Sequence, residues 1–189
     1  MDQLTVLDRA AAGFAATLAQ VQDDRWDAPT PNDGQSVRDL VAHVIGGNRM
    51  AAVILRGGSR NEGIAQFARG REDTDLIAAF EDSRREQADA FAAPGALDQI
   101  VAHPAADLPA TVLLGFRTTE YGLHGWDLAR AIGVDDSLDP EVAAALWDIL
   151  LPLEGMMAAS GMFGAGRSGS VPDDAPVQDR VLDLAGRRP

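Results

Sequence analysis

The stretch of residues 118–130 carries a carboxylate and an imidazole four positions apart, Glu120 and His124. The apolar residues around them recur at helical spacing, so both side chains are expected to project from one face of a helix. The rest of that face is apolar, which predicts that the pair points into the core. Burying two ionisable groups is costly unless something compensates them, and a shared divalent cation is one such compensation.

A helix offers only two such ligands, so a third must come from another segment. The chain has three histidines, and His43 is the better of the remaining two candidates. It shares a predicted helical stripe with apolar or small residues, namely Leu40, Val44, Gly47, Met50, Ala51 and Ile54. His43, Glu120 and His124 are therefore candidate ligands of one metal, placed like the side chains of facing helices in metal-binding bundles.

Each of these residues also has an interpretation without a metal. Glu120 and His124 would form a solvent-facing pair on a helix, and His43 would be a core histidine bonded to a backbone carbonyl or an opposite side chain. A glutamate and a histidine four apart form a weak motif. The H-E-x-x-H motif of zinc proteases is absent, so that class has no support. The residues alone leave both interpretations open.

The chain contains no cysteine. Disulfides, thiolate ligands and a cysteine nucleophile are thereby excluded, and only nitrogen and oxygen donors remain for a metal. Zinc suits such donors, as do nickel and iron. Any thiol chemistry would need a thiol supplied from outside.

The net charge of −13 and the pI near 4.4 argue against nucleic-acid partners and anionic membrane surfaces. The first residues lack the basic start and apolar run of a signal peptide, and no later run is expected to cross a bilayer. These features predict a cytoplasmic protein.

Capping signals delimit most of the expected helices. Ser36 with Asp39 forms a capping box, Asp139-Pro140 starts a helix, and Gly133 ends one. Helices are predicted over residues 3–22, 37–56, 76–92, 110–132 and 140–150. The segment 57–71 is expected to be a mobile connection with at most a short helical turn, and 97–109 a small hairpin or an extended lead-in.

Strand signals are otherwise nearly absent, so the predicted fold class is all-α, with four long helices able to form a bundle. Residues 1–160 are expected to be that bundle. Residues 161–189 are expected to be a tail without a domain of its own, a loop rich in Gly, Ser and Pro followed by a short helix over 177–184.

Two segments resemble a known family. Residues 33–48, DGQSVRDLVAHVIGGN, and 120–133, EYGLHGWDLARAIG, are similar to motifs of the metal-binding domain of mycothiol-dependent maleylpyruvate isomerases, within the DinB/YfiT-like superfamily. The resemblance covers most of residues 1–155. It implies a four-helix bundle that holds a divalent metal, usually zinc, through His43, Glu120 and His124. It also implies mycothiol as a co-substrate whose thiol the metal activates.

The leading hypothesis is a thiol-dependent transferase or isomerase that acts on a small electrophilic substrate. The alternatives are a non-catalytic or regulatory metal-binding bundle, as a possible homodimer, and a metal-free interaction module. Three arginines are candidates for binding a carboxylate or for surface salt bridges, namely Arg38, Arg49 and Arg130. Trp126 and Asp127 are assigned to packing and a helix-end contact, and His103 to the surface.

Overall fold

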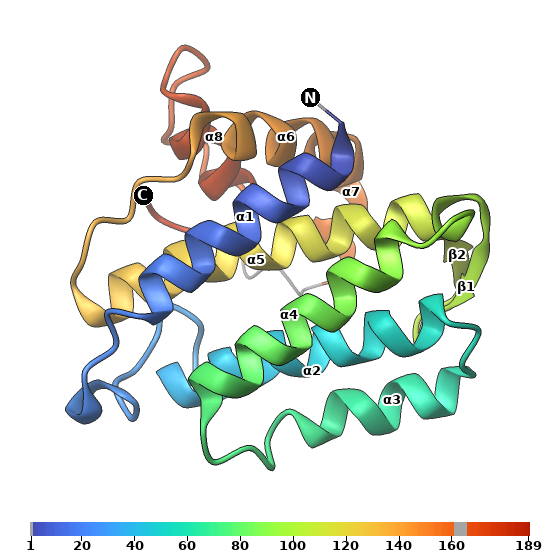
Figure 1. The fold of residues 1–189 in the computed structure, drawn as a ribbon. Coiled ribbons are helices and arrows are strands. Elements are labelled where there is room, and N and C mark those ends of the chain that lie inside the picture. Colours follow the sequence, from blue (N-terminus) through green and yellow to red (C-terminus); the bar gives the residue numbers. More distant parts are fainter. Residues whose placement is uncertain (1, 161–165) are drawn as a thin grey trace.

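The computed structural model describes residues 2–160 and 166–189, and most of this part of the chain is α-helical (Figure 1). The helices are α1 (Gln3–Leu18), α2 (Val37–Leu55), α3 (Arg60–Arg69), α4 (Leu76–Ala92), α5 (Ala110–Ile132), α6 (Pro140–Leu150), α7 (Glu154–Ser160) and α8 (Val177–Leu184). Short 3-10 turns are η1 (Asp23–Arg25), η2 (Ala96–Asp98) and η3 (Leu151–Leu153). The predicted all-α class is confirmed.

Local signals set most helix ends. Ser36 and Asp39 form the expected capping box at the start of α2, and the Asp139 side chain accepts the first free backbone N–H groups of α6. Gly133 ends α5 with φ of 77°, a left-handed conformation that favours glycine. These ends fix where the residues of α2 and α5 point.

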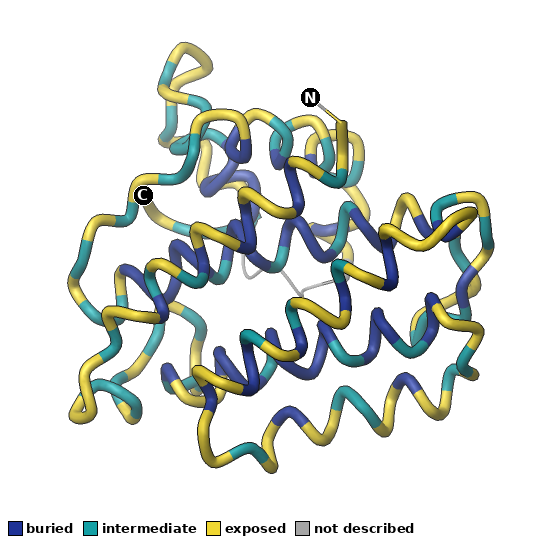
Figure 2. The backbone as a smooth tube through the Cα atoms, in the orientation of Figure 1, coloured by how far each residue is buried: buried dark blue, intermediate teal, exposed yellow. Residues whose placement is uncertain are grey.

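Four long helices form the bundle, with α1 against α5 and α4, and α2 against α4 and α5 (Figure 1). Their inward sides are buried and their outward sides exposed (Figure 2). Phe14 of α1 lies at the centre, with its ring 4.9 Å from that of Phe80 and 6.2 Å from that of Tyr121. The core therefore joins α1, α4 and α5 directly.

The expected hairpin is present between α4 and α5. Strands β1 (Ile100–Ala102) and β2 (Asp107–Pro109) pair antiparallel, with Val101 opposite Leu108. The hairpin leads into the first residue of α5.

The prediction for segment 57–71 was wrong, because α3 is a helix of ten residues. Its start is a second capping box, in which Ser59 accepts from the backbone of Glu62 and Glu62 accepts from that of Ser59. The helix is short of apolar residues and only Gly63 is fully buried, so the segment reads as a polar connection. Close packing on α2 stabilises it.

The C-terminal helix forms as predicted, and α8 packs on α6. The first part of the predicted Gly-rich loop, 161–165, lies outside the described residues. The stretch Pro140–Ala159 has the length and apolar composition of a membrane span, contrary to the expectation that no run would. That stretch is divided into α6, η3 and α7, with Pro152 in η3, and Leu146 and Leu150 of α6 are buried in the core. Composition alone is weak evidence for a span.

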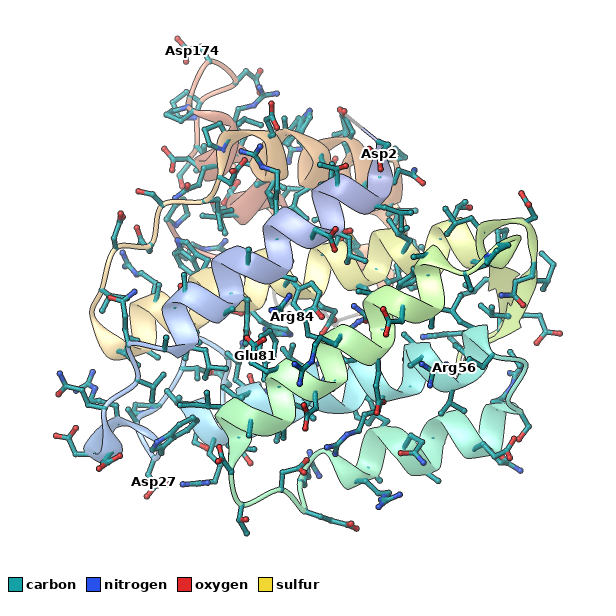
Figure 3. The ribbon with its side chains drawn as sticks, in the orientation of Figure 1. Asp2, Asp27, Arg56, Glu81, Arg84 and Asp174 are labelled. Atoms are coloured by element: carbon teal, nitrogen blue, oxygen red, sulfur yellow. The ribbon has the colours of Figure 1, made fainter. Side chains whose placement is uncertain are left out.

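Acidic side chains are spread over the surface (Figure 3). Asp27, in the loop before α2, and Asp174, in the loop before α8, both extend away from the bundle. Glu81 and Arg84 pair with each other on α4 at 2.7 Å.

Candidate metal centre

Glu120 and His124 lie on successive turns of α5 and face α2. The Nε2 atom of His124 is 3.4 Å from Oε2 of Glu120. From α2, the Nε2 atom of His43 approaches the same oxygen to 2.8 Å. The structure thus brings together the three residues singled out from the sequence.

The arrangement fits a divalent cation. One donor atom from each of the three residues can be chosen so that all lie within 4.8 Å of one another. Ligands of tetrahedral zinc lie about 2.0–2.2 Å from the metal, and hence roughly 3.3 Å apart. Small side-chain rotations would bring these donors to that spacing, and two imidazoles with one carboxylate are a set that zinc, nickel or iron accepts.

The expectation that these side chains point into the core is met only in part, because they face the neighbouring helix but are not fully buried. The side chains of His43, Glu120 and His124 are 35%, 30% and 14% exposed. The cluster therefore lies at the edge of the core, where a ligand from solvent can reach it.

The charges of the cluster are strongly coupled. Burial alone would raise the pKa of Glu120, but His124 and His43 hold it well below its ordinary value. Burial alone would lower the pKa of His124, but Glu120 and Asp127 raise it to about 9. Two carboxylates thus stabilise positive charge at His124, as they would stabilise a bound cation.

Asp127 orients the ring of His124. Its Oδ2 atom lies 3.0 Å from Nδ1 of His124, and its side chain is fully buried. Burial alone would raise the pKa of Asp127, but hydrogen bonds and charges from His124 and Arg187 lower it. A carboxylate on the far nitrogen of a ligating histidine directs the other nitrogen at the metal. This contact replaces the predicted helix-end role, and the signal for it was the i, i+3 spacing from His124.

Arg117 is a second residue that the sequence did not reveal as part of the site. Its side chain is 4% exposed, and Nη1 lies 3.8 Å from Oε2 of Glu120. Its other nitrogens donate to Gln87 Oε1, Val44 O and Asn48 Oδ1. The guanidinium is thus fixed beneath Glu120 by groups from α2 and α4.

Glycines allow the close approaches that build this side of the bundle. A Cβ on Gly47 would lie 2.1 Å from Nη1 of Arg117, and one on Gly46 would lie 2.3 Å from the carbonyl oxygen of Phe67. The second contact brings α3 onto α2, where the ring of Phe67 meets that of His43 edge-on at 5.2 Å. The missed helix α3 therefore supplies an apolar neighbour to a candidate ligand.

Each of the three candidate arginines pairs with an aspartate. Arg49 forms two hydrogen bonds to Asp73, at 2.6 and 3.0 Å. Arg38 and Arg130 each lie over a tryptophan and near an aspartate, with Trp26 and Asp27 the partners of Arg38, and Trp126 and Asp136 those of Arg130. This agrees with the salt-bridge interpretation of these arginines.

The tryptophans beside these arginines and the remaining histidine have packing roles. Trp126 is buried as expected, and Trp26 packs partly buried against the core. His103 is half-buried at the hairpin, 5.8 Å from the ring of Phe116, outside the three-residue cluster.

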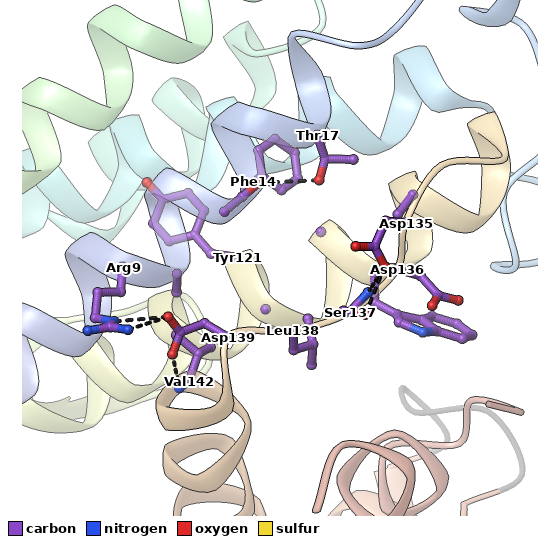
Figure 4. Close-up of a pocket in the computed structure, with 16 residues that line it drawn as sticks. Arg9, Phe14, Thr17, Tyr121, Asp135, Asp136, Ser137, Leu138, Asp139 and Val142 are labelled. Atoms are coloured by element: carbon purple, nitrogen blue, oxygen red, sulfur yellow. Dashed lines mark hydrogen bonds and ion pairs between the residues drawn. The ribbon is translucent and has the colours of Figure 1, made fainter.

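A small open pocket of about 60 Å³ lies on the opposite face of α5 (Figure 4). It is bounded by α1 and the loop after α5, and includes Gly122, Gly125 and Asp139. Arg9 already pairs there with Asp139, so the polar groups at the rim are partly satisfied. None of the three candidate ligands lines this pocket.

Comparison with known proteins agrees with the fold. Residues 7–129 match the family model of the mycothiol maleylpyruvate isomerase N-terminal domain. The chain belongs to this family. The matched residues run from α1 to near the end of α5 and include His43, Glu120 and His124.

Relatives and solved structures extend this picture. Uncharacterized proteins from two strains of Mycobacterium tuberculosis are 32% identical over 200 residues, covering 99% of this chain and 98% of theirs. The crystal structure of a mycothiol-dependent maleylpyruvate isomerase aligns with a TM-score of 0.67 at 16% identity, covering 87% of this chain and 72% of that one. A histidine-to-alanine mutant of that enzyme aligns with a TM-score of 0.66. The DinB-like bundle predicted from the sequence is therefore the fold of this isomerase-family chain.

Proposed function

We propose that this protein binds a divalent metal, most readily zinc, through His43, Glu120 and His124 and uses it in a thiol-dependent transfer or isomerisation. The convergence of the three donors carries this proposal, because they come from two helices and meet at one point. Family membership supports mycothiol, or a similar small thiol, as the co-substrate. The absence of cysteine requires the thiol to come from outside the chain.

The chain's residues would divide the work as follows. His43, Glu120 and His124 would hold the cation, whose Lewis acidity would lower the pKa of a bound thiol. Asp127 keeps Nε2 of His124 directed at the cluster. Arg117 places a fixed positive charge beside Glu120, which favours anionic ligands at the exposed side of the site.

The net charge of the site supports the same class of ligand. Glu120 and Arg117 are opposite in charge, as are Asp127 and Arg187, and with neutral imidazoles the four sum to zero. A divalent cation would leave the site doubly positive. A thiolate and a substrate bearing negative charge would offset that excess.

A second candidate is a metal-binding bundle without catalysis. The alignment spans 72% of the solved isomerase, so the fold alone does not bring that enzyme's whole activity to this chain. The two candidates differ in one measurement. With zinc and mycothiol present, the enzyme converts a small electrophile, consuming the thiol if it transfers it and releasing the thiol unchanged if it isomerises the substrate. The non-catalytic bundle binds zinc and leaves the electrophile unchanged.

Metal binding is tested by elemental analysis of protein purified without chelator. We expect close to one divalent ion per chain in the wild type and loss of that ion in His43→Ala and His124→Ala. His103→Ala is the matched control, because it removes the remaining histidine outside the cluster and should leave the metal content unchanged. Equal metal content in all four proteins would overturn the ligand assignment.

Zinc should also stabilise the wild type. At one hundred times the dissociation constant, the free energy of unfolding rises by about 2.7 kcal/mol. A metal-free module would show no such rise.

The proposal extends to the organisation of the chain and to its location. Residues 1–160 would form the working bundle, with 161–189 as a tail without a domain of its own. We also propose a cytoplasmic location and, for the non-catalytic alternative, a homodimer.

A further inference from the structure

The structure assigns to Arg187, in the C-terminal tail, the role of a positioning residue for the candidate ligand His124, acting through Asp127. This inference rests on the proposed metal site. It adds a residue from outside the matched family domain, which ends at residue 129.

Arg187 donates to both carboxylate oxygens of Asp127 through one edge of its guanidinium group. Nε donates to Oδ1 at 3.2 Å and Nη2 donates to Oδ2 at 2.7 Å. Only 10% of the Arg187 side chain and none of the Asp127 side chain is exposed. A buried bidentate pair of this kind is both directional and strong, because little water competes for its charges.

The same Asp127 oxygen meets His124. Oδ2 lies 3.0 Å from Nδ1 of His124 and accepts from Nδ2 of Asn32, also at 3.0 Å. Arg187 and Asn32 both donate to this carboxylate and so fix its orientation. The carboxylate is thereby held against the imidazole of His124. Nδ1 is then the nitrogen that keeps its proton, and Nε2, which faces Glu120, is the nitrogen that can release its proton and bind a metal.

The fold of the C-terminal segment places Arg187 beside Asp127. Val181, Leu182 and Leu184 are buried and seat α8 on the bundle. After α8 the chain reverses at Gly186, whose φ is 77°. Gly186 N donates to Asp183 O at 3.0 Å and Arg187 N donates to Leu182 O at 2.8 Å, the two bonds of a Schellman motif. These backbone hydrogen bonds fix the position of Arg187 independently of the contacts of its side chain.

The adjacent residue has a different environment and provides a matched control. Arg188 is 53% exposed and pairs with Asp183 at 3.4 Å, without contacting Asp127. A general effect of charge or of tail stability would be expected from both arginines. An effect through Asp127 is expected from Arg187 alone.

The test compares wild type, Arg187→Gln and Arg188→Gln for binding of Zn²⁺ by chelator competition and for the ligand-field spectrum with Co²⁺. Circular dichroism and the unfolding midpoint of the metal-free proteins report folding. For Arg187→Gln we expect a dissociation constant 10–100-fold higher, the range typical of lost outer-shell partners, and an altered Co²⁺ spectrum. Arg188→Gln should match the wild type in both.

Three outcomes would decide against the assignment. A folded Arg187→Gln protein with wild-type affinity and spectrum would overturn it while leaving the metal site intact. Equal losses in both variants would show a general effect of the tail. Failure of the wild type to bind Zn²⁺ or Co²⁺ would overturn the proposed function itself, and this inference with it.

Arg187→Lys keeps the assignment testable if Arg187→Gln does not fold. Lysine retains the charge but cannot form the two-pronged contact. We expect affinity between those of wild type and a protein lacking the contact, and full wild-type affinity and spectrum would contradict the role.

Discussion

Nη1 of Arg117 lies 3.8 Å from Oε2 of Glu120, so a buried guanidinium faces the carboxylate on which two histidines converge. The remaining nitrogens of Arg117 are held by Gln87, Asn48 and the carbonyl of Val44. The guanidinium group of Arg117 is therefore part of the candidate site and also part of the core.

Replacing Arg117 by Met should destabilise the protein by about 3 kcal/mol or more, because it leaves buried acceptors unpaired and removes the positive charge beside Glu120. Urea unfolding measures the change. Arg85→Met is the control, since Arg85 is 66% exposed in its pair with Asp82 and should change stability by less than about 1 kcal/mol. Similar stabilities for the two variants would contradict the role of the buried network.

Gly47→Ala should destabilise the protein by about 1–3 kcal/mol, because the added methyl group collides with the Arg117 guanidinium. Gly13→Ala is the matched substitution, in an exposed part of α1 where a Cβ meets nothing within 4 Å. It should stabilise the protein by roughly 0.5–1 kcal/mol, the difference in helix propensity. The prediction fails if both changes have the same sign.

The chelator-treated protein should lose stability as the pH rises from about 6.5 to 9. The pKa of His124 is raised from 6.5 to about 9, so in this window the folded protein binds a proton that the unfolded chain has released. The stabilisation that this proton provides is fully present below pH 6.5 and is lost above about pH 9. Thermal unfolding across this range measures it, and His124→Gln should have a flatter profile.

Zinc binding should depend on pH in the opposite sense, because Nε2 of His124 must lose its proton to coordinate. Affinity is expected to increase as the pH rises toward 9. An affinity independent of pH would argue that His124 is not a ligand.

Tyr121 provides a direct measure of core integrity, since it is the only tyrosine. Burial raises its pKa from 10.0 to about 12, although Arg117 and the hydrogen bonds with Gln87 and Asn48 act in the opposite direction. Tyrosinate absorbance should therefore appear only together with alkaline loss of helical signal. A midpoint near 10 in a protein that is still helical would contradict the burial of this ring.

Helix ends were predictable because their signals are local. Ser36 with Asp39, Asp139 with Pro140, and Gly133 each act within a few residues of a helix end. The helix α3 was missed because it has few apolar residues and its stability depends on a glycine-mediated approach to α2. Its capping residues, Ser59 and Glu62, were the available signal.

The candidate ligands were identifiable by residue type and spacing, but their supporting residues were not. Arg117 looks like any helical arginine until Gln87 and Asn48 are placed around it. Arg187 is 60 residues from Asp127 in the chain, so no local pattern joins them. The partial exposure of His43 also depends on how α2 and α5 meet, which helical periodicity alone does not specify.

His43 and Glu120 are separated by 77 positions, and α3, α4 and the hairpin lie between them. A cation bound by both residues would cross-link the two ends of that segment. No disulfide could do so, because the chain has no cysteine. Metal supply would then set how long the middle of the chain resists proteases, as well as whether chemistry can occur.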